Sequence, residues 1–430
     1  MDTRSARSDL TGRALDRVPG GKSPAGPGLV VARGHGDART ENLLVHGDNL
    51  PALEALARTL SGKIRCVYLD PPFNTGRTFA EYDDARAPEE WERMMRPRLE
   101  ALVPLLADDG AVFVEIDDTQ LAPLTLLCDA VFGAKNRIST ITVVRSASTG
   151  HKAINRGPVH VTDFLLLYAK DRRRWRYRPQ LKVRDGFDDA YTTWLDAPEK
   201  RPALWTFRPL RAAVAAALGY ATERAARAAL GREAFVARVH AHALRNARHV
   251  VRFAQPRYEA IGLAAQRIVD RSREKPGRVF VLEREGRPPF IVRGGNRVLF
   301  LADKVRTVEG RPVIVEPLTN VWDDVPFQGI AREGGVVFSR NKKPERLVAR
   351  VLAMASDPGD WVLDPFVGSG TTCSVAHKMG RRWIGIDNGE HLETLAEPRL
   401  RRVVDGADRT GVTAATGFAG GGGFKVARLA

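Results

Sequence analysis

Cysteine and long apolar runs are both scarce in this chain. Its 430 residues include only three cysteines, Cys66, Cys128 and Cys373, and they lie far apart. This spacing excludes a disulfide framework and the clustered ligands of a zinc site, so we predict no metal and expect three small buried apolar side chains. No window approaches the roughly 18 uninterrupted apolar residues of a transmembrane helix, and the basic N-terminus lacks the apolar core of a secretory signal. The composition therefore favours a chain that works in the reducing cytoplasm, without a membrane partner.

Acidic residues are outnumbered in only one part of the chain. Between Arg145 and Asn320 there are 35 Lys and Arg against 17 Asp and Glu, a net charge of +18. The remaining residues carry 32 Lys and Arg against 34 Asp and Glu, so the surplus of +16 belongs to the central block. A merely Arg-rich composition would spread the surplus evenly. The uneven distribution therefore predicts a polyanionic partner whose phosphates this block neutralises.

Strand-like and helix-like segments alternate over most of the chain. Residues 1–40 are rich in Gly, Pro, Arg, Ser and Asp, which predicts a mobile N-terminal arm. Beyond them the alternation consists of apolar, strand-like runs at 42–46, 66–69, 111–116, 361–364 and 382–387, and of amphipathic, helix-like segments at 50–60, 88–106, 121–132 and 344–355. Such alternation predicts a doubly wound, mostly parallel α/β sheet with helices on both faces.

The alternation stops near Lys170 and resumes near residue 321. The intervening segment begins with Asp171–Arg178, where basic and aromatic side chains interleave. That mixture can pair with phosphates and stack on bases, although a charged hairpin edge is the alternative. An Ala/Arg-rich, helix-favouring stretch, Arg211–Val250, and short β-rich runs follow. Residues 171–320 are therefore predicted to form a basic domain inserted into the sheet.

The stretch Val67–Phe73 joins a buried strand to a stiff loop. Apolar residues lead into Asp70, Pro71, Pro72 and Phe73, and an apolar run that ends at proline is typical of a strand stopping at a sheet edge. The two prolines restrict the backbone. The loop could grip a flat ring that bears an amine, with Phe73 stacked on the ring and with Asp70 and the Pro71 carbonyl accepting the amine protons. The alternative is a strand-terminating turn with an incidental aspartate.

A glycine-rich turn follows a second apolar strand. The turn reads Asp364-Pro365-Phe366-Val367-Gly368-Ser369-Gly370-Thr371-Thr372. Its glycines would let a ligand approach the backbone, and Asp387, 23 residues after Asp364, could hold ribose hydroxyls. Gly370 is followed by Thr371 rather than lysine, which excludes a phosphate-binding P-loop. Asp364 at the strand tip would repel a pyrophosphate, but it suits a ligand with a cationic amino group, such as S-adenosylmethionine.

Together the two motifs resemble those of the permuted, β-class amino-methyltransferases of DNA, in which the catalytic tetrapeptide precedes the target-recognition insert and the cofactor motif comes last. The resemblance covers roughly residues 41–430. In detail the chain is most similar to the modification subunit of type III restriction-modification systems, although it is shorter. The segments that carry this likeness are Ile116–Asp118, Cys128–Gly133, Thr149–Lys152, Thr319–Asp324 and Gly420–Lys425.

The resemblance implies a role for each motif residue. The catalytic residues that it implies are Asp70, Pro71, Pro72 and Phe73. The residues that it implies for binding S-adenosylmethionine are Asp364, Pro365, Phe366, Gly368, Gly370, Thr371, Asp387, Asp48 and Lys343. Among these, Asp387 would take the ribose, Asp48 would lie near the adenine, and Lys343 would contact the methionine end.

The expected fold is a circularly permuted, doubly wound sheet of the S-adenosylmethionine-dependent methyltransferase type. We expect a mobile arm at 1–40, a catalytic half at 41–170, a target-recognition insert at 171–320 and a cofactor-binding half at 321–430. The expected function is site-specific methylation of N6 of a flipped-out adenine in double-stranded DNA. The alternatives are N4 of cytosine, an RNA or small-molecule methyltransferase, and a non-catalytic DNA-binding protein. Whether the chain acts alone, as a homodimer or with a restriction (helicase-nuclease) subunit stays open.

Overall fold

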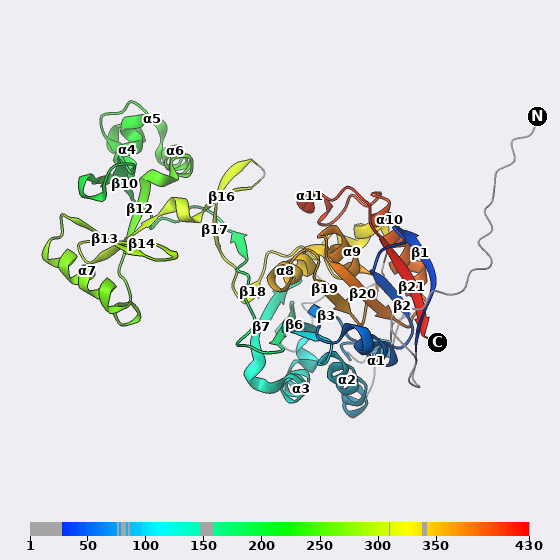
Figure 1. Cartoon of the computed structure of the whole chain (residues 1–430). Coiled ribbons are helices and arrows are strands. Elements are labelled where there is room, and N and C mark those ends of the chain that lie inside the picture. Colours follow the sequence, from blue (N-terminus) through cyan, green and yellow to red (C-terminus); the bar gives the residue numbers. More distant parts are fainter. Residues whose placement is uncertain are drawn as a thin grey trace, which may run out of the picture. The chain divides into compact units, whose positions relative to one another are not determined.

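The computed structural model describes residues 28–74, 77–78, 83–84, 87–146, 158–308, 310–337 and 342–429. The chain divides into two units (Figure 1). The sheet unit consists of the chain up to Gln180 and from Leu318 onwards, and the insert unit consists of Leu181–Pro317. Each unit has its own apolar core.

A ten-stranded sheet forms the centre of the sheet unit. In spatial order its strands are β1 (Leu29–Gly36), β21 (Gly423–Leu429), β2 (Leu43–His46), β20 (Arg382–Asp387), β19 (Trp361–Asp364), β3 (Ile64–Leu69), β6 (Leu106–Ile116), β8 (Thr162–Ala169), β7 (Arg137–Val144) and β18 (Val321–Trp322). The six strands from β21 to β6 run parallel to one another, whereas β1 and β8 are antiparallel to their neighbours. The predicted doubly wound, mostly parallel sheet is confirmed.

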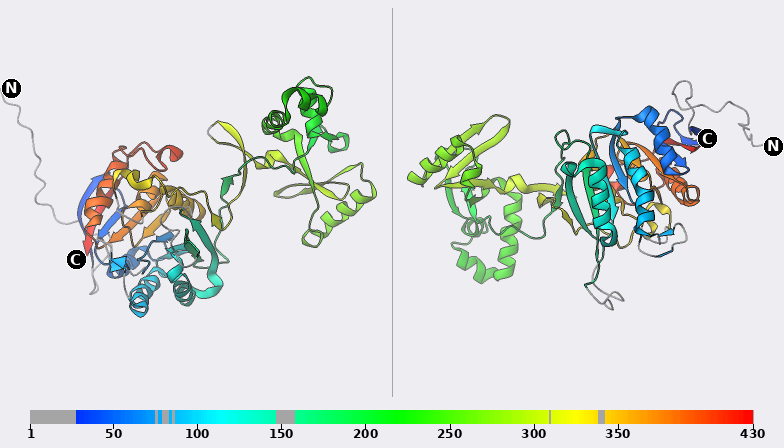
Figure 2. Two further views of the ribbon diagram at one scale, coloured as in Figure 1. Left: turned by 180° about the vertical axis from the view of Figure 1, so that it is seen from behind. Right: turned by 90° about the horizontal axis from the view of Figure 1, so that it is seen from below.

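Helices cover both faces of this sheet (Figures 1 and 2). One face packs against α1 (Asn49–Leu60), α2 (Pro88–Leu102) and α3 (Asp118–Cys128), and the other against α8 (Glu345–Ala355), α9 (Thr371–Lys378) and α10 (Glu397–Val404). Successive side chains of a strand point to opposite faces, so Val67 and Leu69 of β3 join the first core while Cys66 and Tyr68 join the second. The sheet is therefore buried on both sides, as a parallel sheet requires.

In its described residues, the insert unit contains antiparallel strands and four α-helices. Its larger sheet has the order β11 (Thr206–Pro209), β10 (Thr193–Asp196), β12 (Val250–Ala254), β15 (Asn296–Phe300), β14 (Arg287–Arg293) and β13 (Val279–Arg284). A smaller sheet contains β16 (Val305–Val308), β17 (Arg311–Pro317) and β9 (Leu181–Val183). The helices are α4 (Leu210–Ala217), α5 (Glu223–Leu230), α6 (Arg232–Arg245) and α7 (Leu263–Glu274).

Two predicted boundaries were wrong. Part of the expected mobile arm, Leu29–Gly36, forms the edge strand β1, because its backbone pairs antiparallel with β21 at the other end of the chain (Figure 1). Residues 1–27 lie outside the described residues. The insert was expected to begin at residue 171, but the chain up to Gln180 belongs to the sheet unit, where Trp175 packs against the apolar core. The sheet unit also contains the two-residue strands β4 (Arg77–Thr78) and β5 (Asp83–Asp84) and the short helix α11 (Thr413–Thr416).

Among the residues that the structure describes, none of the helices combines the length and the hydropathy that a bilayer crossing would require.

Candidate active site

The two sequence motifs meet at one edge of the sheet. Strands β3 and β19 are parallel neighbours, with Val67 opposite Leu363, so the loop after β3 and the turn after β19 leave the sheet side by side. The register of the neighbouring parallel strands brings Asp387 of β20 and Asp48, just after β2, to the same edge. The carboxyl ends of strands in open α/β sheets are where ligands bind.

The loop after β3 is held by the helix α2. Phe73 is buried, and the indole Nε1 of Trp91 in α2 donates a hydrogen bond to the Pro72 carbonyl at 2.8 Å. The loop ends at Asn74, whose φ of 56° lies in the left-handed region that non-glycine residues rarely adopt. The prolines and the Trp91 contact together fix the position of Asp70 relative to the sheet.

A buried lysine contacts this loop from the other half of the chain. The ammonium of Lys343 lies 3.1 Å from Asp70 Oδ1 and 3.1 Å from Glu115 Oε1, and it sits over the Phe73 ring, 4.6 Å from its centre. Burial disfavours the charged ammonium, but attraction to Asp70 and Glu115 outweighs this and raises the pKa of Lys343. The side chain that was predicted to contact the methionine end of a cofactor thus touches the loop predicted to hold the target ring.

Burial also changes the acidity of Asp70. Removal from water raises the pKa of Asp70, and the ammonium of Lys343 opposes that rise. The carboxyl group therefore ionises at a higher pH than an ordinary aspartate, and its ionised form is the one that accepts strong hydrogen bonds from a ring amine.

The glycine-rich turn after β19 presents backbone and a second buried carboxyl. Asp364 is buried, its Oδ1 accepts a hydrogen bond from the Phe366 amide at 2.9 Å, and burial raises the pKa of Asp364 to about 7. Gly368 and Gly370 have φ values of 50° and 80°, which favour glycine. A Cβ atom at Gly368 would come no closer than 4.0 Å to other atoms, whereas one at Gly370 would lie 3.2 Å from Ala396.

Asp387 ties this turn to the segment that follows β20. Its Oδ2 accepts a hydrogen bond from the Gly368 amide at 3.0 Å, and its Oδ1 accepts one from the Gly389 amide at 3.0 Å. The Nε2 atom of His391 also lies 3.0 Å from Oδ1. Since a carboxylate has about four acceptor positions, Asp387 can still accept a hydrogen bond from a ligand hydroxyl at Oδ2.

Asp48 has structural partners in addition to its place at the sheet edge. Its Oδ1 caps α1 by accepting a hydrogen bond from the Leu50 amide at 2.8 Å, and its carboxylate pairs with Arg98 of α2 at 3.0 Å. The next residue, Asn49, reaches the second motif, because its side-chain amide donates to the Pro365 carbonyl at 2.8 Å. Asn49 thus connects the start of α1 to the glycine-rich turn.

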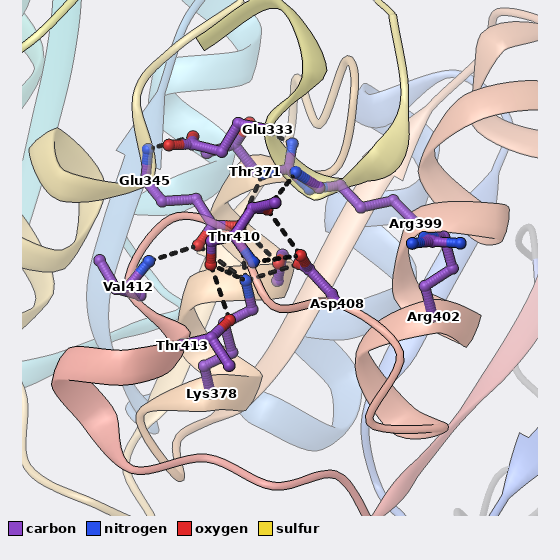
Figure 3. Close-up of polar contacts among 12 residues, drawn as sticks. Glu333, Glu345, Thr371, Lys378, Arg399, Arg402, Asp408, Thr410, Val412 and Thr413 are labelled. Atoms are coloured by element: carbon purple, nitrogen blue, oxygen red, sulfur yellow. Dashed lines mark hydrogen bonds and ion pairs between the residues drawn. The ribbon is translucent and has the colours of Figure 1, made fainter. Parts of the chain in front are cut away.

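A buried ionic network supports the glycine-rich turn (Figure 3). Arg399 of α10 donates to the Thr371 hydroxyl at 2.7 Å and to the Ser369 carbonyl at 3.4 Å, and it also pairs with Glu345 at 2.8 Å. Lys378 of α9 pairs with Glu345 at 2.8 Å and with Asp408 at 2.6 Å. These charged side chains are almost entirely excluded from water. Their contacts connect the glycine-rich turn to helices α8, α9 and α10.

Sequence reasoning missed several residues that contact the two motifs. Those that contact the motifs directly are Asn49, Trp91 and Arg399. Glu115, with its partner Tyr68, instead contacts the predicted site residue Lys343. A local pattern could have pointed to Glu115, since it is the one charged residue inside the apolar run 111–116. The other partners carry no such mark. The predicted segment Thr149–Lys152 lies outside the described residues.

Comparison with known proteins places the chain among DNA methylases. The model of the DNA methylase family matches residues 64–223 and 302–398, more than half of the chain. The "Probable type III restriction-modification enzyme HindVI Mod subunit" of Haemophilus influenzae is 29% identical over 414 residues, which cover 91% of this chain and 54% of that protein. The EcoPI Mod subunit of Escherichia phage P1 is 29% identical over 163 residues, or 31% of this chain and 25% of that protein. The chain thus spans about half the length of the first relative.

Solved structures of methyltransferases are also similar to the chain, but their sequence identity to it is lower. The complex of M1.HpyAVI with SAM has a TM-score of 0.39 and 12% identity, and it covers 83% of this chain and 98% of that chain. The PvuII DNA methyltransferase (cytosine-N4-specific) has a TM-score of 0.38 and 13% identity, and it covers 84% of this chain and 93% of that chain. At these values they add nothing to the family match. The extent of that match shows that the chain belongs to the DNA methylase family.

Proposed function

We propose that the chain is a site-specific DNA methyltransferase that moves a methyl group from S-adenosylmethionine to N6 of an adenine flipped out of the duplex. The observation that carries the proposal is the pairing of β3 with β19, because it sets the Asp70–Phe73 loop beside the glycine-rich turn. One motif is suited to a flat ring with an amine, and the other to a nucleoside with a cationic amino group. Their adjacency supports group transfer between the two ligands.

The residues of the glycine-rich turn fit S-adenosylmethionine. A Cβ atom at Gly368 would come no closer than 4.0 Å to other atoms, so the space beside this glycine leaves room for a ligand against the backbone. Asp364, with Pro365 and Phe366 beside it, would hold the amino group, Asp387 the ribose hydroxyls, and Gly370 and Thr371 would shape the turn. Asp48 remains our candidate for the adenine side and Lys343 for the methionine side. When bound, the cofactor supplies a methyl group activated by its sulfonium.

The residues of the Asp70 loop would orient the target amine. A ring amine is a poor nucleophile, because its lone pair is delocalised into the ring. Hydrogen bonds from both amine protons, to Asp70 and to the Pro71 carbonyl, favour a tetrahedral nitrogen whose lone pair is free to react. The Pro72 carbonyl is already engaged by Trp91, which leaves the Pro71 carbonyl as our proposed second acceptor. A base inside a duplex cannot reach this loop, so the base must leave the stack, at a cost of a few kcal/mol that stacking on Phe73 partly offsets.

Adenine is the favoured target because of the first residue of the tetrapeptide. An ionised aspartate is a stronger acceptor than a serine hydroxyl, and in the family resemblance Asp goes with adenine and Ser more often with cytosine. The larger purine would also gain more from stacking on Phe73. The insert unit, with 26 Lys and Arg against 15 Asp and Glu, would supply the phosphate contacts and the sequence recognition. By analogy with the Mod subunits, a restriction subunit is the proposed protein partner, and the cytoplasm the proposed compartment.

Product analysis tests this proposal. The purified chain is incubated with labelled S-adenosylmethionine and unmodified DNA, and the digested nucleosides are separated by mass. We expect label in N6-methyl-2′-deoxyadenosine, and we expect Asp70→Ala to lower turnover at least about 100-fold, because a positioned electrostatic contact is lost. Calorimetric titration should find cofactor binding by Asp70→Ala unchanged, which checks the fold. Label only in methylcytosine would overturn the choice of base, and full turnover by Asp70→Ala would overturn the mechanism.

A further inference from the structure

A second carboxylate lies behind Asp70 and has no role in the mechanism so far. Glu115 is fully buried on β6, the strand that pairs with β3 on the side away from β19. Its Oε2 accepts a hydrogen bond from the hydroxyl of Tyr68, and its Oε1 lies 3.1 Å from the ammonium of Lys343. A buried carboxylate is costly unless it is paired, so its presence inside an apolar strand calls for a function.

The titratable groups that interact with Glu115, or with its neighbours Tyr68, Asp70 and Asp163, come from five strands or their loops and from the segment before α8. These groups are Tyr68 and Asp70 from β3 and its loop, Asp117 after β6, Asp163 of β8, Arg145 after β7, Asp364 of β19, and Lys343. Asp163 has its own cation, because Arg145 lies 3.3 Å from its Oδ1. Lys343 is therefore shared between Asp70 and Glu115, at equal distances of 3.1 Å.

This sharing creates a conflict in the proposed reaction. Asp70 must accept a hydrogen bond from the target amine while its Oδ1 contacts the ammonium of Lys343. A carboxylate can accept from both donors, but they then compete for the negative charge of one group. A buried ammonium that loses its only counter-charge is strongly destabilised. If Asp70 were the only partner of Lys343, freeing the carboxylate for the target would carry that penalty.

We propose that Glu115 is a positioning residue for Asp70, which keeps the ammonium of Lys343 neutralised when Asp70 turns to the amine of the target base. The inference rests on the proposed methyl transfer and assigns a residue on which that proposal does not depend. Tyr68 holds Glu115 in place for this exchange, since its hydroxyl contacts the oxygen that Lys343 does not use. The alternative is that Glu115 serves only to join β3, β6 and the start of α8.

The substitution Glu115→Gln separates these two roles. Glutamine keeps the size of the side chain and an oxygen for the Tyr68 hydroxyl, but it removes the charge. We expect kcat to fall at least about tenfold with little change in the KM for DNA, since the loss appears only when Asp70 engages the amine. We also expect the fall of kcat on the acid side of its pH profile (the acid limb) to move to lower pH, because the charge of Glu115 helps to raise the pKa of Asp70.

A control variant and a double substitution complete the test. Glu345→Gln removes an equally buried, paired carboxylate on α8, and it should lower stability without moving the acid limb. In a Lys343→Met background, Glu115→Gln should change kcat less than about twofold, because no ammonium is left to neutralise. If Glu115→Gln alone does not fold, Lys343→Met is compared directly with the double variant, and a change in kcat of about tenfold or more between these two would overturn the inference.

The outcomes distinguish this inference from the proposed function. If the wild type methylates DNA while Glu115→Gln keeps its kcat and its acid limb, Glu115 is not a positioning residue and the methyltransferase proposal stands. Equal effects of Glu115→Gln with and without Lys343 would likewise reduce Glu115 to a structural contact. If the wild type transfers no methyl group to any DNA, the proposed function fails, and the role of Glu115 fails with it.

Discussion

Four aspartates at the same sheet edge differ in their surroundings. Asp48 is partly exposed and pairs with Arg98, and Asp387 accepts two backbone hydrogen bonds. Asp70 lies against Lys343, whereas Asp364 has hydrogen-bond donors around it and is buried. The four carboxyl groups therefore differ in exposure and in partners, and this suits them to different roles. The difference comes from the neighbouring residues, because the side chain is the same.

The environment of Asp364 predicts a pH dependence of cofactor binding. Burial raises the pKa of Asp364 to about 7, so the carboxyl group is mostly protonated at pH 6 and mostly ionised at pH 8. A ligand with a cationic amino group binds the ionised form, and its affinity should therefore rise with pH, by about fivefold to tenfold between pH 6 and 7.5. Calorimetric titration of S-adenosylmethionine at these pH values measures the effect.

Two variants show whether this dependence comes from Asp364. Asp364→Asn should bind weakly at every pH and should lose the rise, because its amide does not ionise. Asp387→Asn is the matched control: it should weaken binding through the ribose but keep the rise. A rise that survives in Asp364→Asn would show that another group titrates.

Helices α8, α9 and α10 support the glycine-rich turn through the buried network of Figure 3. Arg399 connects the turn to Glu345, and Lys378 connects Glu345 to Asp408. The Val412 amide also donates to Glu345 at 3.0 Å, so the chain after α10 joins the same network. The geometry of the turn thus depends on elements that are far from it in the sequence.

Removing Arg399 should destabilise the sheet unit strongly. Arg399→Ala leaves the fully buried Glu345 with one cation fewer, and breaking a buried pair in this way costs about 3–5 kcal/mol. Arg401→Ala, on the same helix, removes an arginine that pairs with Glu397 but is 45% exposed, and it should cost at most about 1 kcal/mol. Urea denaturation followed by circular dichroism compares them, and similar losses in both variants would contradict the role given to the network.

The whole molecule contains a sheet unit and a basic insert unit, and the chain leaves and re-enters the sheet unit at one place. The Leu318 amide donates a hydrogen bond to the Gln180 carbonyl at 2.8 Å, so the two ends of the sheet unit adjoin. The basic stretch Asp171–Arg178 lies on the sheet-unit side of this junction, where Arg178 pairs with Asp357 at 3.1 Å. Because the insert unit carries 26 Lys and Arg against 15 Asp and Glu, we expect it to supply most of the interactions with DNA phosphates.

Replacing Leu181–Pro317 with a short glycine-containing loop should separate the two functions. Since Gln180 and Leu318 adjoin, we expect the sheet unit to fold and to keep its affinity for S-adenosylmethionine. DNA affinity should fall at least about tenfold, its salt dependence should flatten, and site-specific methylation should disappear. Calorimetry, DNA binding at several salt concentrations and methylation-aware sequencing measure these changes.

A control addresses the loop itself. The same loop inserted at Gly286, in the turn between β13 and β14, should leave DNA binding and site choice unchanged in the full-length chain. Methylation of the same sites by the shortened chain would show that target recognition does not reside in the insert unit.

Local patterns in the sequence by themselves determined the alternation of strands and helices, the two motifs and the place of the aspartates at strand ends. Apolar periodicity, prolines and glycines act on residues a few positions apart, so these features can be read along the chain. They led to the doubly wound sheet, and they identified the Asp70 loop and the glycine-rich turn before either was seen in space. The match to the DNA methylase family model agrees with the family resemblance that these motifs indicated.

Only the tertiary structure decided which distant residues became partners. The strand β1 forms because Leu29–Gly36 meets β21 near the other end of the chain, and Lys343 meets Glu115 although 228 positions separate them. The insert also begins later in the chain than predicted, because Trp175 packs against the apolar core of the sheet unit. The local charge pattern does not reveal this contact. A short segment specifies its own conformation and its apolar face, but the counter-charge of a buried carboxylate depends on how the whole sheet closes around it.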